Sequence, residues 1–304
     1  MMLSLVILFA IYLHASASDI TCTYFKGALR LATTGRGKLM HLCRINGTNY
    51  ELPDVFIEDV EALGFESGST RLQLHNVRPN NRTHILDVLT DSPFMEIVPQ
   101  FAQRISVSRT TGQRKVLVVR VISDTGVERL EPSISKQRLK NTIFGNPKNP
   151  SRANFNSQYE LCSNGQLSFT PASTSNGNSY GVVNLFTTET MKNKDFTIEL
   201  EGAVARAFAS KFGATSQYDH IMYCLPKGMN AEFIAFAYVN DNASFFSDPW
   251  CGSLSSTMHE IAHNMGMGTS TCLIVNYDID IANAHHQPFL IISAFRRTWT
   301  GRIR

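Results

Sequence analysis

The first third of the chain alternates short apolar runs with turn-forming residues. Between about residues 18 and 112, Gly, Asn, Pro and Ser separate runs rich in β-branched and aromatic side chains, and no long helical period is present. Such runs between turn residues are typical of strands. They read ITCTYFKGAL, KLMHLCRI, TRLQLHNV, THILDVL and RISVS. This pattern predicts a small β-rich N-terminal domain over residues 18–112.

A different pattern begins at about residue 113. Residues 116–123 form a continuous apolar run, VLVVRVIS, of the kind found in strands buried on both faces. A helix is expected around residues 133–143, and further strands are expected in GQLSFTP, GVVNLF, HIMYCL and FIAFAYV. Strands that alternate with helices indicate an α/β or α+β domain on a mixed sheet, and we assign it to the α+β class. This domain is expected to cover residues 113–268.

Residues 195–213, DFTIELEGAVARAFASKFG, show the clearest helical period of the chain. Asp195 or Thr197 is suited to cap the start of this helix, and Gly213 is suited to end it. The apolar positions of one face are Leu200, Val204, Ala207 and Phe208.

A second helix is predicted from the segment SLSST, residues 253–257, which offers several hydroxyl side chains to cap its start. Thr257 and Glu260 have the spacing of a capping box. Gly266 is expected to end the helix in the left-handed conformation. The positions of its apolar stripe are Leu254, Met258, Ile261 and Met265.

This second helix also carries the pattern His-Glu-x-x-His, with His259 and His263 four residues apart on a side other than the apolar stripe. Neutral imidazoles bind Zn²⁺, and a zinc-bound water ionises near neutral pH. Glu260 cannot share the direction of the two histidines, so its expected role is to take the proton of that water. The alternative is a solvent-facing or hydrogen-bonded helix without metal.

Features of the whole chain indicate export. The N-terminal 17 residues combine an apolar run with the small-residue pattern Ala15-Ser16-Ala17, which predicts a secretory signal peptide. No later run is long enough for a membrane span. Six cysteines fit an oxidising compartment, and the sequons at Asn46, Asn81 and Asn242 agree with it. The net charge of +3 is too weak and dispersed to indicate a nucleic-acid partner.

Three stretches resemble the gametolysin family of metzincin zinc metallopeptidases. They are QYELCSNGQLSFTPA, DHIMYCLP and WCGSLSSTMHEIAHNMGMG, and the resemblance covers about residues 116–268. It implies a metzincin-like mixed sheet with an active-site helix, zinc ligation by His259 and His263, and Glu260 as the general base. The family's third histidine would fall at position 269, which is Thr269, and no methionine follows Met267.

The resemblance also bears on the two ends of the chain. It implies that residues 18–112 form an inhibitory pro-region, in which Cys22 or Cys43 either ligates the metal as a thiolate or forms a Cys22–Cys43 disulfide. Residues 269–304 are an atypical tail, and the likeness is expected to stop at Gly268. A chain without the family's lower subdomain is expected to leave the apolar stripe of the active-site helix partly exposed. The residues of the tail that could supply a third ligand are His285, His286, Asp278 and Asp280.

The resemblance therefore implies a secreted zinc metalloendopeptidase, and the family's association with matrix and cell-wall glycoproteins implies extracellular or cell-wall proteins as its substrates. Its expected partner is a protein or peptide substrate, with neither nucleic acid nor stable membrane insertion. The alternative is a truncated or inactive protease-like secreted protein that acts by binding a partner. A third, weaker possibility is that the N-terminal β-domain is an adhesion or carbohydrate-binding module.

Overall fold

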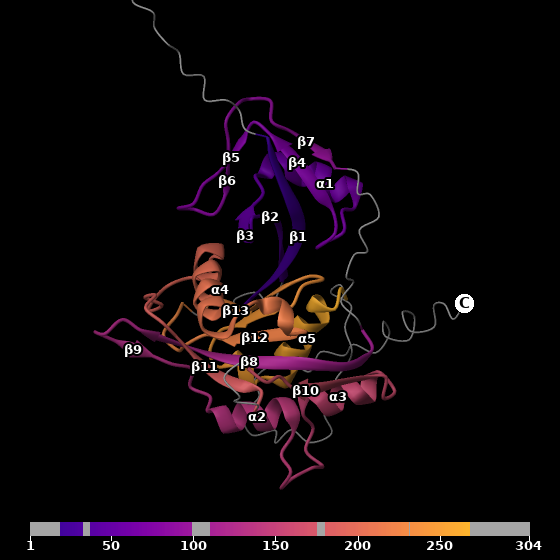
Figure 1. The fold of residues 1–304 in the computed structure, drawn as a ribbon, viewed down its shortest axis with the longest axis vertical. Coiled ribbons are helices and arrows are strands. Elements are labelled where there is room, and N and C mark those ends of the chain that lie inside the picture. The colour runs from indigo at the N-terminus through magenta and orange to yellow at the C-terminus, as the bar shows by residue number, and fades with distance from the viewer. Residues whose placement is uncertain (1–18, 33–36, 99–109, 175–179, 231, 268–304) are drawn as a thin grey trace, which may run out of the picture.

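The computed structural model describes residues 19–32, 37–98, 110–174, 180–230 and 232–267. Over these residues one mixed sheet of 12 strands extends from the N-terminal part into the second half of the chain. Figure 1 shows the N-terminal part above and the second half below, joined along β1. The predicted α+β class with a mixed sheet is confirmed.

The N-terminal part is built from strands and a short helix around its own apolar cluster, which contains Tyr24, Val60 and Leu72. Its strands are β1 (Ile20–Leu31), β2 (Gly37–Ile45), β3 (Thr48–Glu51), β4 (Arg71–His75), β5 (Val77–Pro79), β6 (Leu86–Val88) and β7 (Phe94–Ile97). Its helices are η1 (Asp54–Phe56) and α1 (Ile57–Leu63). The predicted run RISVS lies outside the described residues.

The second half is organised around the long strand β8 (Gly112–Asp124), which the sequence predicted. On one side, β8 pairs in parallel with β10 (Leu167–Pro171) and then with β11 (Val182–Thr187). On the other side the order is β12 (His220–Cys224), β14 (Ala243–Phe246) and β13 (Phe233–Tyr238), of which β13 is antiparallel to β14. The two-residue strand β9 (Arg129–Leu130) pairs with the end of β8.

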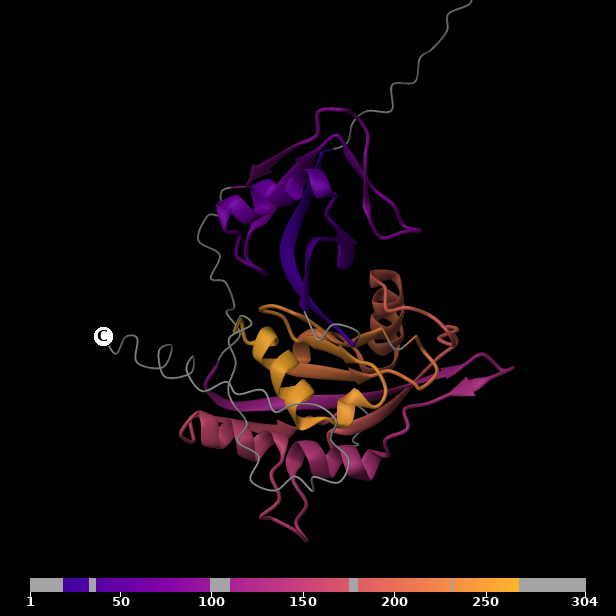
Figure 2. The same cartoon turned by 180° about the vertical axis from the view of Figure 1, so that it is seen from behind.

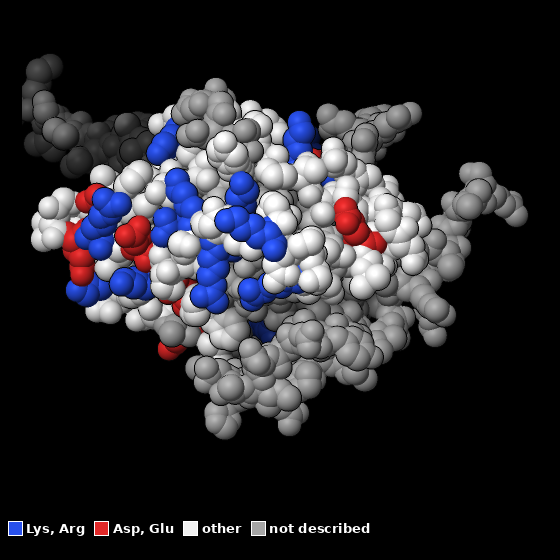
Figure 3. Space-filling model, turned by 90° about the horizontal axis from the view of Figure 1, so that it is seen from below, with Lys and Arg blue, Asp and Glu red and all other residues white. Residues whose placement is uncertain are grey.

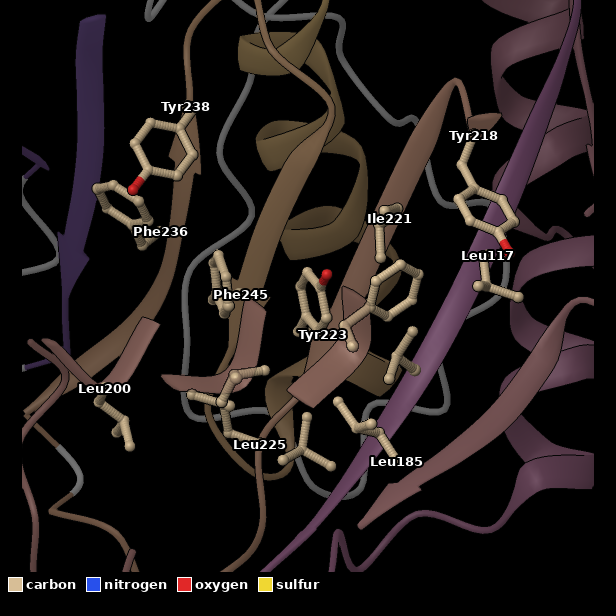
Figure 4. Packing of buried hydrophobic residues seen from close by; sticks show 14 of the residues in the cluster. Leu117, Leu185, Leu200, Tyr218, Ile221, Tyr223, Leu225, Phe236, Tyr238 and Phe245 are labelled. Carbon is tan, nitrogen blue, oxygen red and sulfur yellow. The ribbon is translucent and has the colours of Figure 1, made fainter. Parts of the chain in front are cut away.

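Helices cover both faces of this sheet. On one face, α4 (Ile198–Phe212) packs Val204 and Phe208 against a cluster that Figure 4 shows around Leu117, Tyr223 and Phe245. On the other face lie α2 (Lys136–Phe144), α3 (Phe155–Cys162) and α5 (Leu254–Asn264). Two short 3₁₀ helices, η2 (Thr215–Gln217) and η3 (Trp250–Gly252), precede β12 and α5. Among the described helices, none is long and apolar enough to cross a membrane.

The predicted caps of α4 are confirmed, because the Thr197 side chain accepts from Leu200 N–H and Gly213 follows the helix with φ of 84°. The pattern did not predict α1, α3 or β14. The seven residues of α1 bury only Val60, and β14 has four residues, so neither presents a recognisable period.

The N-terminal part is joined to the second half by strand pairing. Strand β1 pairs antiparallel with β13, with Gly27 opposite Tyr238 and Arg30 opposite Ala235. The main chain at Val239 also donates to Lys26, at an N–O distance of 2.8 Å. The edge of the second half's sheet at β13 is therefore covered by the chain's own N-terminal strand.

Candidate metal centre

The helix α5 starts at the hydroxyl-rich segment, which supplies its cap as predicted. Ser253 is the N-cap, and its side chain accepts from Ser256 N–H. Thr257 lies inside the helix, where its hydroxyl donates to the Ser253 and Leu254 carbonyls at 3.1 Å each. The predicted capping box between Thr257 and Glu260 is therefore wrong, because Thr257 bonds backward to the first turn instead of forward.

The apolar stripe of α5 packs onto the sheet. Met258, Ile261 and Met265 are 4%, 0% and 2% exposed and belong to the cluster that contains Val118 and Ala235. Leu254, the first residue of the stripe, is only partly buried against the same cluster, so the expected partial exposure is confined to the start of the helix. The rest of the stripe is covered by the strands that precede it in the chain.

The C-terminal end of α5 is fixed to two strands. The Asn264 amide donates to the carbonyls of Tyr238 and Ala243, at 2.8 and 2.9 Å. Gly266 ends the helix with φ of 77°, and an added Cβ there would lie 2.0 Å from Asn240 Oδ1. Glycine is thus required at this position both for its backbone conformation and for space.

The two histidines of α5 bring their Nε2 atoms together, 3.1 Å apart. His263 Nδ1 lies 3.1 Å from the Met267 carbonyl, which accepts its proton and leaves Nε2 free to act as a ligand. Two nitrogens on a tetrahedral zinc, each at about 2.0–2.1 Å, would be roughly 3.3 Å apart. The imidazole pair therefore has the donor atoms and the separation that a shared zinc ion requires.

Burial keeps both imidazoles neutral, which is the form that binds metal. It lowers the pKa of His259 to about 3, with smaller contributions from His263 and Arg30. Burial also lowers the pKa of His263, against the hydrogen bond to Met267. Protons therefore do not compete with a metal for this pair at neutral pH.

Glu260 is buried between these histidines in the sequence and is 1% exposed. Neither of its carboxylate oxygens has a hydrogen-bond partner among the described residues. Burial raises its pKa to about 8, while the charge of Arg30 acts in the opposite direction. A buried carboxyl group without partners is costly for folding, so a group held in this state is a candidate for chemistry.

Over the described residues, no cluster of three or more His, Cys, Asp or Glu side chains is placed to hold a metal. The structure therefore supplies two of the three protein ligands that a catalytic zinc site needs. Thr269 and the predicted alternatives Asp278, Asp280, His285 and His286 lie outside the described residues.

The structure adds two disulfides, one of them predicted, and an effect of Arg30 on the site that the sequence did not predict. Cys22 and Cys43 form a disulfide, with Cα atoms 5.5 Å apart, which confirms that alternative and excludes a metal-bound thiolate at either position. Cys224 and Cys251 form a second one, which ties β12 to the segment before α5. The influence of Arg30 on His259 and Glu260 was missed, because only the pairing of β1 with β13 brings it near α5.

Comparison with known families gives one match. The model of the gametolysin peptidase M11 family matches residues 114–285, which is more than half of the chain. The match starts close to the predicted position but continues past Gly268, so the expectation that the likeness stops there is wrong. No curated protein and no solved structure matches the chain.

Proposed function

The chain belongs to the gametolysin peptidase M11 family, and from this premise we propose that it is a secreted zinc metalloendopeptidase with a metzincin-like site. The observation that carries the proposal is the pairing of His259 and His263 Nε2 atoms at 3.1 Å, on the same helix as the buried carboxyl group of Glu260, which has no hydrogen-bond partner in the described part of the chain. Its substrates are extracellular or cell-wall proteins, the class that the family resemblance implies.

Each residue of the site has a role that its surroundings support. His259 and His263 would hold the metal through Nε2, and the Met267 carbonyl fixes the ring of His263. A bound zinc ion supplies a polarised water and a positive charge that favours the ionised form of a nearby carboxyl group. Glu260 would then accept a proton at an oxygen that has no partner among the described residues, and would donate a proton to the departing amine.

The N-terminal part, residues 18–112, acts in this proposal as an inhibitory pro-region. An extended peptide commonly binds an enzyme by adding to an exposed strand edge. Strand β13 packs against α5, and its outer edge is taken by β1. The charge of Arg30 on β1 also reaches Glu260 and His259. Peptides would reach the β13 edge only after β1 leaves it.

Secretion is supported by the two described disulfides, which persist in oxidising compartments. The three sequons differ in their surroundings. Asn46 and Asn81 are exposed, whereas the Asn242 Nδ2 atom donates to the Thr215 and Tyr218 carbonyls at 2.8 and 3.2 Å. A glycan would take the place of one of these bonds, so we assign glycosylation to Asn46 and Asn81.

The zinc content and peptidase activity of the Glu260→Gln variant test the function. We expect about one zinc per chain in both proteins. In protein from which the pro-region has been cleaved, the variant should hydrolyse labelled casein at least about 100-fold more slowly than the wild type, because the base is lost. Glu189→Gln, which changes an exposed carboxylate outside the site, is the matched control and should keep full activity.

A second function is favoured by the two-histidine ligand set among the described residues. In this case the chain is an inactive relative that acts by binding a partner. A folded, pro-region-cleaved wild-type protein that retains no zinc after dialysis and does not hydrolyse casein would contradict the enzyme and leave the inactive relative. Hydrolysis that persists in Glu260→Gln would remove Glu260 from its proposed role.

A further inference from the structure

The opposite edge of the sheet, at β11, has a different character from the β13 edge. Among the described residues β11 pairs only with β8, so its other side is a free strand edge. A groove of about 620 Å³ runs beside it. Helix α2, on one face of the sheet, and α4, on the other, both contribute to its walls.

The main chain of β11 offers hydrogen-bonding groups to this groove. Val118 N–H donates to the Gly181 carbonyl, so the alternation along a parallel pair points the main chain of Val183 and Leu185 toward β8 as well. The N–H and C=O groups of Asn184 and Phe186 therefore point away from β8. The Asn184 carbonyl accepts from Lys211 Nζ at 3.1 Å, a bond that the N–H of an added strand could replace.

The side chains of the groove are basic and aromatic. Lys136 and Lys140 of α2 and Lys211 of α4 line it, and no Asp or Glu is among the lining residues. None of these three lysines has a carboxylate partner in the part of the chain that the structure describes. Figure 3, seen from the side of α2 and α3, shows Lys and Arg side chains gathered on this face.

Two aromatic side chains are exposed in the same place, Tyr180 at 66% and Phe186 at 45%. Lys140 Nζ lies 4.6 Å from the centre of the Tyr180 ring, and Lys211 Nζ lies 5.1 Å from that of Phe186. Lysines alone would protect a free edge from unwanted pairing. Exposed rings do not serve that purpose, because they add apolar surface that a ligand can cover.

We propose that the β11 edge is a docking site for an extended acidic segment of another polypeptide. The segment adds to β11 as a strand, and its carboxylates contact Lys136, Lys140 and Lys211. A free strand edge favours a polypeptide over an anionic polysaccharide, which has no regular series of N–H and C=O groups to pair with it. This site is independent of the metal centre, which lies at α5 beside the other edge of the sheet.

Direct binding to the full chain tests the proposal. The probe is a fluorescein-labelled peptide of alternating Glu and Val, measured by anisotropy, with a peptide of alternating Lys and Val as its comparison. We expect only the acidic peptide to bind. Neutralising the groove with Lys136→Gln, Lys140→Gln and Lys211→Gln together should weaken binding at least tenfold. Arg206→Gln, an exposed cation of α4 outside the groove, should leave it unchanged.

A second pair of variants separates strand addition from general attraction to anions. Phe186→Pro removes the outward N–H of an edge residue, where proline is tolerated, and Phe186→Ala removes only the ring. Strand addition predicts at least threefold weaker binding for the proline variant than for the alanine variant. If the proline and alanine variants bind the acidic peptide with equal affinity, and heparin binds as tightly as the peptide, the groove is a general anion-binding surface and the proposal is overturned. Absence of binding to the acidic peptide would overturn it as well and leave the lysines as edge protection.

Discussion

The two outer edges of the second half's sheet are treated in opposite ways. At β13, the chain covers the edge with its own strand β1, and Arg44 and Asn49 of the same N-terminal part add polar contacts. At β11, the edge is free among the described residues and is lined by basic side chains. The covered edge belongs to the strand that packs against α5, the helix with the two histidines.

This difference indicates that the covering of β13 is specific. Free edges are usually protected by charges, proline or short strands, and the lysines near β11 show that this solution is available to the fold. At β13 the chain instead uses a long strand that could leave as a unit with its own apolar cluster. Phe25 of β1 and Leu42 of β2 nevertheless belong to the core cluster of the second half, so release of this cover would expose apolar surface there.

The largest effect is expected from Gly27→Val on β1. An added Cβ at Gly27 would lie 2.5 Å from Phe236 Cε2, and Phe236 is fully buried, so the side chains cannot coexist without displacing β1. Overpacking of this kind costs about 1–3 kcal/mol. Hydrogen exchange at the Val239 amide, which donates to Lys26, should accelerate, while β11 is unaffected.

Gly37→Val is the control for this variant, because the nearest atom to an added Cβ at Gly37 is 3.9 Å away. If β1 is inhibitory, Gly27→Val should also raise casein hydrolysis severalfold. Unchanged exchange at Val239 would contradict the structural part of the prediction. Faster exchange without a gain in hydrolysis would contradict only the inhibitory role.

The elements that could be predicted from the sequence are those with a strong local pattern of residues. The α4 period and the α5 histidine spacing were sufficient to locate both helices and to place His259 beside His263. Local patterns have no information about which strands become neighbours. The pairing of β1 with β13, and with it the effect of Arg30 on Glu260, joins residues about two hundred positions apart and could not be read from either segment.

Burial was also beyond what local patterns reveal. The helical wheel of α5 correctly separated its apolar stripe from its histidines, but it could not show that Glu260 is buried without partners. The same holds for the choice of cap, since Ser253 and Thr257 are both suitable residues and only the backbone decides between them. Spacing gives adjacency along one helix, whereas burial depends on the elements packed around it.

The next largest effect is expected in the pH dependence of the unfolding free energy. It arises from Glu201 of α4, where the second half meets the N-terminal part. Its carboxylate accepts from the Asn49 amide of β3 at 3.4 Å. Burial raises the pKa of Glu201 to about 6, against the opposing charge of Arg44. A raised pKa means that the folded protein binds the proton more tightly than the unfolded chain.

The stabilisation from that proton is therefore complete below about pH 4.5 and is lost as the pH rises through about 6. The loss amounts to about 2 kcal/mol of unfolding free energy. Denaturant unfolding at pH 4 and pH 7.5 should show most of this decrease in the wild type and a smaller one in Glu201→Gln. Other titrating groups contribute equally to both proteins, so subtracting one pH dependence from the other leaves the contribution of Glu201. If the unfolding free energies of both proteins change equally with pH, Glu201 is excluded as the source of the change.

A smaller effect is expected from the ion pair between Arg44 of β2 and Asp241, which follows β13. Arg44 Nη2 lies 2.7 Å from Asp241 Oδ2, and their side chains are 26% and 20% exposed. A partly exposed pair of this kind contributes about 0.5–1.5 kcal/mol. A double-mutant cycle with Arg44→Gln and Asp241→Asn measures this coupling in the free energy of unfolding.

The matching test at the other edge completes the comparison. Lys136, Lys140 and Lys211 have no carboxylate partners among the described residues, so replacing all three with Gln should change the unfolding free energy by less than about 0.5 kcal/mol each. Salt should weaken the Arg44–Asp241 coupling, because the pair is partly open to solvent. A coupling near zero would mean that strand pairing alone holds the N-terminal part on β13. A large decrease in the unfolding free energy of the lysine variants would mean that the lysines at the β11 edge stabilise the fold, as the contacts of the N-terminal part do at β13.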